Sequence, residues 1–190
     1  MEPNHQPSLS TPTAAASAAS LNLPLGYRFC PTDKELILEY LHKKLLNEEL
    51  PPNRFVDVEL YEHTPEQLSA SHAMIGKKEW YFFTSKKRNY LKTNTPNPAV
   101  GSGDSGSTNG YWKEIGVDKI IRDRSATTIG IKKILMFYEG EPPNGRKTRW
   151  MMDEYRVDDV PKSITAGVNY PDMRFDAWVL CKIYRNRTKL

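Results

Sequence analysis

Residues 110–119 read GYWKEIGVDK and place an aromatic pair, a lysine and a turn glycine on one short segment between basic flanks. Tyr111 and Trp112 offer flat, largely apolar faces, whereas Lys113 offers an ammonium group. A two-stranded ribbon fits the major groove of duplex DNA, and surrounding lysines and arginines can hold the phosphates. This combination indicates the chemistry of a surface that reads a nucleic-acid backbone.

Positive charge is concentrated in parts of the chain. The 190 residues include 27 Lys and Arg and 23 Asp and Glu, so the formal net charge is only +4. Residues 77–92 alone hold six basic residues and one acidic residue. A single basic run is as compatible with a solvated face as with a ligand, but several runs beside aromatic strands favour a polyanionic partner. Further runs contain Lys119, Arg122, Arg124, Lys132 and Lys133, then Arg146, Lys147 and Arg149, then Lys182, Arg185, Arg187 and Lys189.

Residue types that serve catalysis or metal binding are present without the spacing that such sites need. Cys30 and Cys181 are far apart and form no CxxC pair, and the four histidines show no ligand spacing. Cys30 and His42 lack a third residue that would orient a nucleophile and its base. Asp153 and Glu154 are neighbours on a predicted strand, so they point to opposite faces. We predict no enzyme activity, no metal and no cofactor.

Residues 101–106, GSGDSG, formally match the glycine pattern of dinucleotide sites. Such a site needs a strand immediately before the glycines and a helix after them. We predict neither element there and interpret the segment as part of a long loop over residues 94–109.

The order of elements is helices first and strands afterwards. Residues 1–22 are rich in Ser, Thr, Pro and Ala and are predicted to be a disordered tail, followed by one domain over 23–185 and a short basic tail over 186–190. Thr32 and Glu35 form a capping-box pattern ahead of apolar residues at helical spacing, and Thr64 and Gln67 repeat the pattern ahead of a short helix. No apolar run approaches a membrane span and no secretory signal is evident, so we expect a soluble intracellular protein.

Aromatic and β-branched runs separated by Gly, Pro and Asn predict the strands. We expect an α+β fold, a twisted antiparallel β-sheet flanked by a few helices, with a second irregular segment over 158–176. The predicted strands are 79–84, 110–113, 119–122, 130–138, 150–156 and 178–184.

Three stretches together resemble the plant NAC transcription-factor domain: 23–36 (LPLGYRFCPTDKEL), 110–119, and 178–184 (WVLCKIY). The resemblance runs from about residue 23 to residue 185. It implies a nuclear, sequence-specific transcription regulator that binds double-stranded promoter DNA as a dimer at a short CACG-like core. The alternative for Trp112, which the family places at the groove, is a core residue. The groove residues would be Trp112 and Lys113, with phosphate candidates Lys86, Lys87, Arg88, Lys119, Lys132, Lys133, Arg146, Lys147 and Arg149.

The chain departs from the family pattern W-K-A-T-G-x-D-K at Glu114 and Ile115, and it carries Val117 where lysine is common in the family. A carboxylate that faces phosphates repels them. Residues 94–98, NTPNP, also lack the two arginines of the S-R-P-N-R-like family stretch. Fewer phosphate contacts predict weaker binding and a shallower salt dependence.

In the family, the L-P-x-G-[FY]-R-F segment joins two protomers, which implies that Arg28 meets Glu35 of the other chain. An ion pair within one chain is the alternative. An exposed ion pair contributes only about 0–1 kcal/mol, so apolar burial must support the dimer. A second hypothesis is a dimerisation module that pairs with other NAC proteins and dampens their DNA binding. The implied dimer residues are Leu23, Gly26, Tyr27, Arg28, Phe29 and Glu35.

Overall fold

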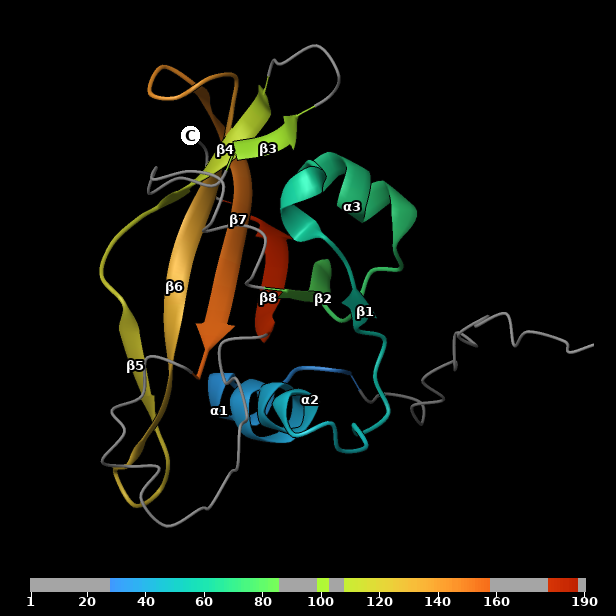
Figure 1. Cartoon of the computed structure of the whole chain (residues 1–190), viewed down its shortest axis with the longest axis vertical. Coiled ribbons are helices and arrows are strands. Elements are labelled where there is room, and N and C mark those ends of the chain that lie inside the picture. The colour runs from blue at the N-terminus through green and yellow to red at the C-terminus, as the bar shows by residue number, and fades with distance from the viewer. Residues whose placement is uncertain (1–27, 86–98, 103–107, 158–177, 188–190) are drawn as a thin grey trace, which may run out of the picture.

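A long twisted sheet dominates the computed structural model, which describes residues 28–85, 99–102, 108–157 and 178–187. Figure 1 shows a helical stretch packed at one end of the sheet and a separate helix, α3, beside the other end. The fold is α+β, as predicted, and the sheet is its scaffold.

The first helical stretch is continuous: α1 (Asp33–Glu35), a π-helical turn η1 (Leu36–Leu41) and α2 (His42–Leu45). It begins at the predicted capping box. The Glu35 backbone N–H donates to Thr32 Oγ1 at 3.2 Å, and the Thr32 N–H donates to Glu35 Oε2 at 2.7 Å. These bonds satisfy N–H groups that a helix start otherwise leaves without partners.

The second predicted helix is also present. After a 3₁₀ turn, η2 (Leu60–Glu62), α3 spans Pro65–Ser71. Thr64 accepts from the Gln67 N–H at 3.3 Å, and the Gln67 side chain accepts from the Thr64 N–H at 2.8 Å. Proline occupies the first turn, where a missing N–H costs nothing.

The sheet has the strand order β1-β2-β8-β7-β6-β4-β3, and β5 pairs with β6 beside that path. Strand β6 is twelve residues long and is therefore shared along its length, first by β5 and then by β4. The strands are β1 (Val56–Asp57), β2 (Glu79–Ser85), β3 (Ala99–Ser102), β4 (Thr108–Glu114), β5 (Lys119–Arg122), β6 (Thr128–Glu139), β7 (Arg146–Arg156) and β8 (Trp178–Arg185).

Two parts of the sheet differ from the sequence prediction. β1 pairs with β2 in parallel, so the sheet is antiparallel except at this edge. Ala99–Ser102, predicted as loop, forms β3 and pairs with β4. The loop prediction is therefore wrong at 99–102 and 108–109. The rest of that segment and residues 158–176 lie outside the described residues.

Each face of the sheet carries its own core. Trp112, Phe137 and Met152 pack with Leu60 and Leu68 on the face under α3. The other face packs against the first helical stretch, and here Gly130 makes close approach possible. A Cβ on Gly130 would lie 2.5 Å from Ile37 Cδ1, closer than real contacts allow. The named members of this second core include Leu36, Ile37, Leu41, Tyr81, Phe83 and Tyr155.

Candidate nucleic-acid interface

The segment 112–118 consists of the end of β4 and the connection to β5, and it runs along the outer side of the sheet (Figure 1). The pairs that β3 makes with β4 reach only to Tyr111, so this stretch lies beyond them. Ile115 donates its N–H to the Ile134 carbonyl at 2.8 Å, and Gly116 then turns the chain at φ +80°. A left-handed φ of this kind favours glycine. Val117 beyond the turn is 89% exposed.

Trp112 is a core residue. Its side chain is 0% exposed, and its ring centroid lies 5.2 Å from that of Phe137. The prediction that its indole enters a groove is therefore wrong, because alternation along β4 points it under α3. The alternative interpretation is the correct one for this residue. Trp112 anchors the strand that carries Lys113.

Lys113 points to the opposite face and is exposed. Its Nζ lies 5.8 Å from the centroid of the Tyr138 ring, within reach of a cation–π contact. Tyr138 in turn stacks on Tyr111, with centroids 5.4 Å apart, and the Tyr111 hydroxyl donates to the Pro143 carbonyl at 3.2 Å. This aromatic platform supports the lysine stem while the ammonium group faces solvent.

Basic residues of β7 lie at the same end of the sheet. Lys147 is directly opposite Tyr138 in the β6–β7 register, and Lys147 and Arg149 are both exposed. Arg146 forms an ion pair with Glu139. Among the described residues, no carboxylate pairs with Lys113, Lys147 or Arg149, so these three cations are available to an anionic ligand.

Lys132 and Lys133 are held by carboxylates of their own chain. Lys133 Nζ lies 3.3 Å from Glu114 and 3.4 Å from Asp118. Burial of Lys133 opposes its charge, but the two carboxylates outweigh that effect and raise the pKa of Lys133. Lys132 is only 12% exposed and lies 2.8 Å from Asp33. Neither lysine presents an unpaired charge at the surface, contrary to their selection as phosphate candidates.

Lys119 is paired with a carboxylate but remains exposed. Its Nζ lies 3.2 Å from Asp33, yet its side chain is 63% exposed. The ammonium group can therefore reach solvent as well as its internal partner. The candidates Lys86, Lys87 and Arg88 lie outside the described residues.

The N-terminal segment is described from Arg28 onward, so Leu23, Gly26 and Tyr27 lie outside it. Phe29 packs within its own chain, with ring centroids 6.0 Å from Tyr40 and 5.5 Å from Tyr81. Arg28 is exposed. Glu35 accepts hydrogen bonds from Thr32, which lower the pKa of Glu35, and in the described part no ion pair joins it to Arg28.

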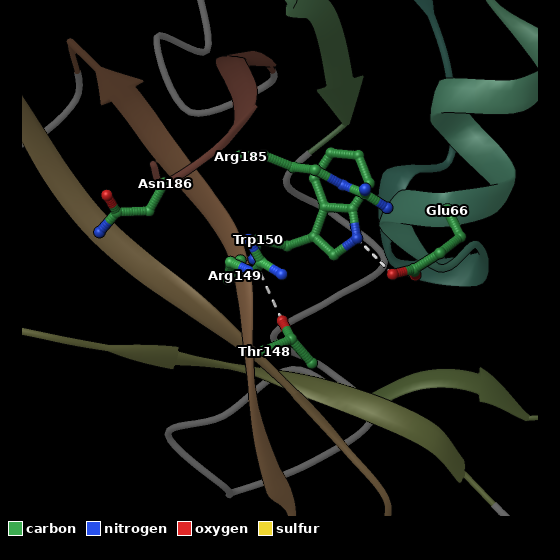
Figure 2. A pocket seen from close by; sticks show the side chains of 6 residues that line it. All are labelled: Glu66, Thr148, Arg149, Trp150, Arg185 and Asn186. Carbon is green, nitrogen blue, oxygen red and sulfur yellow. Dashed lines mark hydrogen bonds between the residues drawn. The ribbon is translucent and has the colours of Figure 1, made fainter. Parts of the chain in front are cut away.

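A pocket of about 260 Å³ lies beside Arg149, between α3 and the ends of β7 and β8. Figure 2 shows the indole of Trp150 in its wall, donating to Glu66, with Arg185 stacked over the ring at 4.5 Å. Arg149 and Arg185 give this wall two guanidinium groups near one carboxylate. Sequence reasoning selected Arg149 but missed the pocket, because no local pattern places Glu66 and Arg185 beside Trp150.

Asp153 and Glu154 contact different partners, as predicted from strand alternation. Asp153 lies 3.0 Å from Lys182, whereas Glu154 accepts from Tyr61 Oη at 2.5 Å. Within the described ranges, no three His, Cys, Asp or Glu side chains gather as they would around a metal ion. Likewise, none of the helices described has the length and apolar character of a membrane span.

Comparisons with known proteins match most of the chain. The family model "No apical meristem (NAM) protein" matches residues 24–157. NAC transcription factor 32 of Arabidopsis thaliana is 43% identical over 171 residues, which cover 90% of this chain and 62% of that protein. NAC domain-containing protein 2 of Oryza sativa subsp. japonica is also 43% identical over 171 residues, 90% of this chain and 51% of that protein. NAC transcription factor NAM-1 of Hordeum vulgare subsp. vulgare is 39% identical over 202 residues, 98% of this chain and 48% of that protein. The chain thus spans about half the length of these curated relatives.

Proposed function

This chain belongs to the NAC family, which the No apical meristem model describes, and from that membership we propose that it is a nuclear transcription regulator that binds promoter DNA as a dimer. The edge of β4 over segment 112–118, beyond the residues that pair with β3, enters the major groove. The major groove is wide enough to admit a β-strand edge. Lys113 contacts base edges, and Trp112 fixes the strand from behind.

The observation that carries this proposal is that Lys113 is exposed and meets no carboxylate among the described residues. Lys113 stands on an aromatic platform beside Lys147 and Arg149, so three cations face solvent at one end of the sheet. Such cations fix the register of the protein by contacting phosphates, while a lysine at a base edge supplies sequence information. Lys119 supplies a further phosphate contact from its exposed position.

Dimer formation uses the N-terminal segment. The two hydrogen bonds that Glu35 accepts from Thr32 both end on Oε2, which leaves Oε1 for the arginine of a second copy. Arg28 is exposed and suited to be that arginine. The second copy can be identical or another NAC protein.

The test is fluorescence anisotropy with a duplex bearing a CACG-type core and with a scrambled duplex, comparing the wild type with Lys113→Ala. We expect Lys113→Ala to lower the affinity for the core duplex by about 1–3 kcal/mol and to lower the preference for it. Lys43→Ala is the matched control, because Lys43 is a helical lysine paired with Glu39 away from β4. An equal loss on both duplexes would assign Lys113 to phosphate contact instead, and no loss would reject its role.

A second candidate function is that of a dimerisation partner that dampens the DNA binding of other NAC proteins. The observation favouring it is that Glu114 occupies the groove segment and holds Lys133, which reduces positive charge there. Adding the protein to a DNA-bound full-length NAC relative distinguishes the two. Release of that relative from the core duplex supports dampening, whereas exclusive self-association counts against it.

A further inference from the structure

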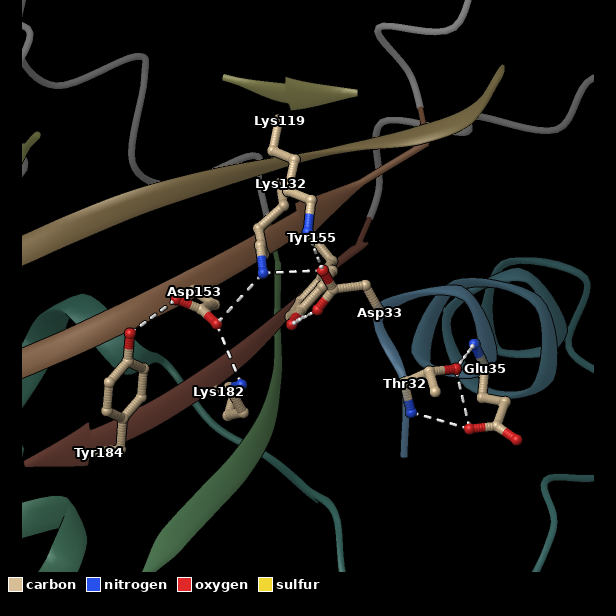
Figure 3. A network of polar contacts seen from close by, with 9 residues as sticks. All are labelled: Thr32, Asp33, Glu35, Lys119, Lys132, Asp153, Tyr155, Lys182 and Tyr184. Atoms are coloured by element: carbon tan, nitrogen blue, oxygen red, sulfur yellow. Dashed lines mark hydrogen bonds and ion pairs between the residues drawn. The ribbon is translucent and has the colours of Figure 1, made fainter. Parts of the chain in front are cut away.

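One carboxylate joins the first helix to three strands of the sheet. Asp33, the first residue of α1, lies 2.8 Å from Lys132 of β6 and 3.2 Å from Lys119 of β5 through Oδ2. Its other oxygen, Oδ1, accepts from the Tyr155 hydroxyl of β7 at 2.8 Å. Figure 3 shows these three side chains converging on Asp33 from the sheet.

A second carboxylate, Asp153, contacts the same lysine as Asp33. Asp153 lies 3.7 Å from Lys132 and 3.0 Å from Lys182, and it accepts from the Tyr184 hydroxyl at 3.0 Å. Lys132 is therefore held between two carboxylates. Lys119 differs, because Asp33 is the carboxylate that it meets among the described residues. Without Asp33, Lys132 keeps Asp153, whereas Lys119 keeps no described ion pair.

Segment 115–118 is attached to the sheet at its two ends. Val117 is 89% exposed, and a Cβ on Gly116 would meet nothing within 4 Å. The segment is held at its start by the hydrogen bond from Ile115 to Ile134. At its end, Asp118 forms an ion pair with Lys133, and Lys119 begins the β5–β6 ladder while its side chain is tied to α1. The Asp33–Lys119 pair is the described ion pair that joins this end of the segment to the helix.

Asp33, at the start of the first helix, directly follows the segment expected to join two protomers. Asp33 follows Thr32 directly, and Thr32 closes the capping box with Glu35. The chain from Arg28 to Thr32 leads straight into Asp33. A single carboxylate thus connects the dimerisation segment with the segment proposed to enter the groove.

We propose that Asp33 is a positioning residue that fixes segment 115–118 relative to the N-terminal dimerisation segment, and so sets the distance between the two groove segments of a dimer. The part concerning the dimer rests on the proposed function. A rigid link of this kind makes affinity depend on the spacing of two half-sites, because both segments must meet successive grooves at once.

The first test does not involve DNA. Hydrogen exchange of backbone amides is compared among the wild type, Asp33→Asn and Asp57→Asn. Asp57 forms an ion pair with Lys44 at 2.7 Å, so its variant removes a comparable carboxylate elsewhere. We expect exchange over residues 115–122 to rise about five-fold in Asp33→Asn, with β8 unchanged. Asp57→Asn should leave residues 115–122 at the wild-type rate.

Lys119→Gln covers the case in which Asp33→Asn fails to fold, because Lys119 is largely exposed and its loss spares the core. It is expected to raise exchange over the same residues. Wild-type exchange at 115–122 in Lys119→Gln and in any folded Asp33→Asn would overturn the positioning role.

The second test uses duplexes with two CACG-type cores at varied spacing, and one duplex with a single core. Wild type should prefer one spacing, while Asp33→Asn should bind the spaced duplexes with a flattened preference when each affinity is divided by that variant's own affinity for the single core. An unchanged spacing preference in Asp33→Asn would overturn the link between Asp33 and dimer geometry. Absence of any preference for the single core over a scrambled duplex would instead reject the proposed function, and the exchange experiment would then decide the role of Asp33.

Discussion

Lys113 and Glu114 are neighbours in β4 that point to opposite faces of the sheet, and their charges have different surroundings. The Lys113 ammonium group stands beside the Tyr138 ring and faces solvent. The Glu114 carboxylate meets Lys133 at 3.3 Å, so this position combines one negative charge with one positive charge. Local charge at the groove segment is therefore set by the Glu114–Lys133 pair together with Asp118, which also lies 3.4 Å from Lys133.

Glu114→Ala tests this balance. The substitution removes a carboxylate and leaves Lys133 paired with Asp118 alone, so we expect tighter binding to both core and scrambled duplexes at low salt. The slope of log Kobs against log salt should steepen by about 0.9 if Lys133 gains one phosphate contact. Anisotropy titrations over a range of salt concentrations measure this slope. Glu39→Ala is the control, because it breaks a helical ion pair with Lys43 and changes the net charge by the same amount. It should leave the slope unchanged. An unaltered slope in Glu114→Ala would contradict the account.

The surroundings of Asp33 predict how the unfolding free energy changes in acid. Burial opposes its charge, but hydrogen bonds from Lys132 and Tyr155 outweigh burial and lower the pKa of Asp33 below its ordinary 3.8. A lowered native pKa stabilises the fold above the unfolded-state value and loses that contribution as pH falls through the native value. The difference in unfolding free energy between wild type and Asp33→Asn should be largest near about pH 6 and shrink toward about pH 2. Urea titrations across this range provide the measurement, and a pH-independent difference would contradict it.

Ion pairs with distant carboxylates explain why some basic residues could be identified from sequence as available to a ligand and others could not. Lys132 and Lys119 are separated from Asp33 by 99 and 86 positions, so no local pattern reveals that a carboxylate holds them. Trp112 was predicted at the groove by resemblance, yet strand alternation with a helix on one face places it in the core. Lys113, on the other face of the same strand, remains a groove candidate.

At the scale of elements, close packing between β4 and β6 positions the groove segment. A Cβ on Gly110 would lie 2.4 Å from Phe137 Cζ and from the Tyr138 carbonyl oxygen. Strand β4 can therefore approach β6 only with glycine here. The strands keep the ladder that runs from Gly110 opposite Glu139 to Glu114 opposite Leu135.

Gly110→Ala should destabilise the domain by about 1–3 kcal/mol, because overpacking forces neighbouring atoms to shift. Urea denaturation measures the loss. Ser125→Ala, in the exposed turn between β5 and β6, is a control expected within about 0.5 kcal/mol of wild type. Wild-type stability for Gly110→Ala would show that the two strands are less tightly packed than described.

Elements with local signals were predictable, and elements that depend on distant partners were not. Both helix starts were predicted because a capping box needs only four consecutive residues. Strand β1 has two exposed residues and forms only by pairing with β2, while β3 lies in a segment whose Gly and Ser content indicates loop. Neither strand has an alternating pattern long enough to predict it.

At the scale of the whole molecule, the proposed dimer depends on an exchanged pair between Arg28 and Glu35. Arg28→Glu and Glu35→Arg are each expected to weaken self-association, because each brings like charges together across the interface. The double variant should restore it. Sedimentation at several protein concentrations measures the dimer, and Lys34→Glu, one residue from Glu35, controls for the change in charge. Because Glu35 also caps the first helix, failure to recover in a double variant that keeps the wild-type helix content would show that these residues do not face each other.

Sequence-specific binding by this chain is the central claim, and the ratio of affinities for a CACG-type core duplex and a scrambled duplex tests it most directly. The ratio is measured by anisotropy on the wild-type protein from low to physiological salt. Purely electrostatic binding loses affinity steeply with salt and does not distinguish the duplexes. We predict a preference for the core duplex that persists at physiological salt, by about ten-fold or more. Equal binding to both duplexes that disappears as salt rises would contradict autonomous recognition and leave the dampening partner as the better account.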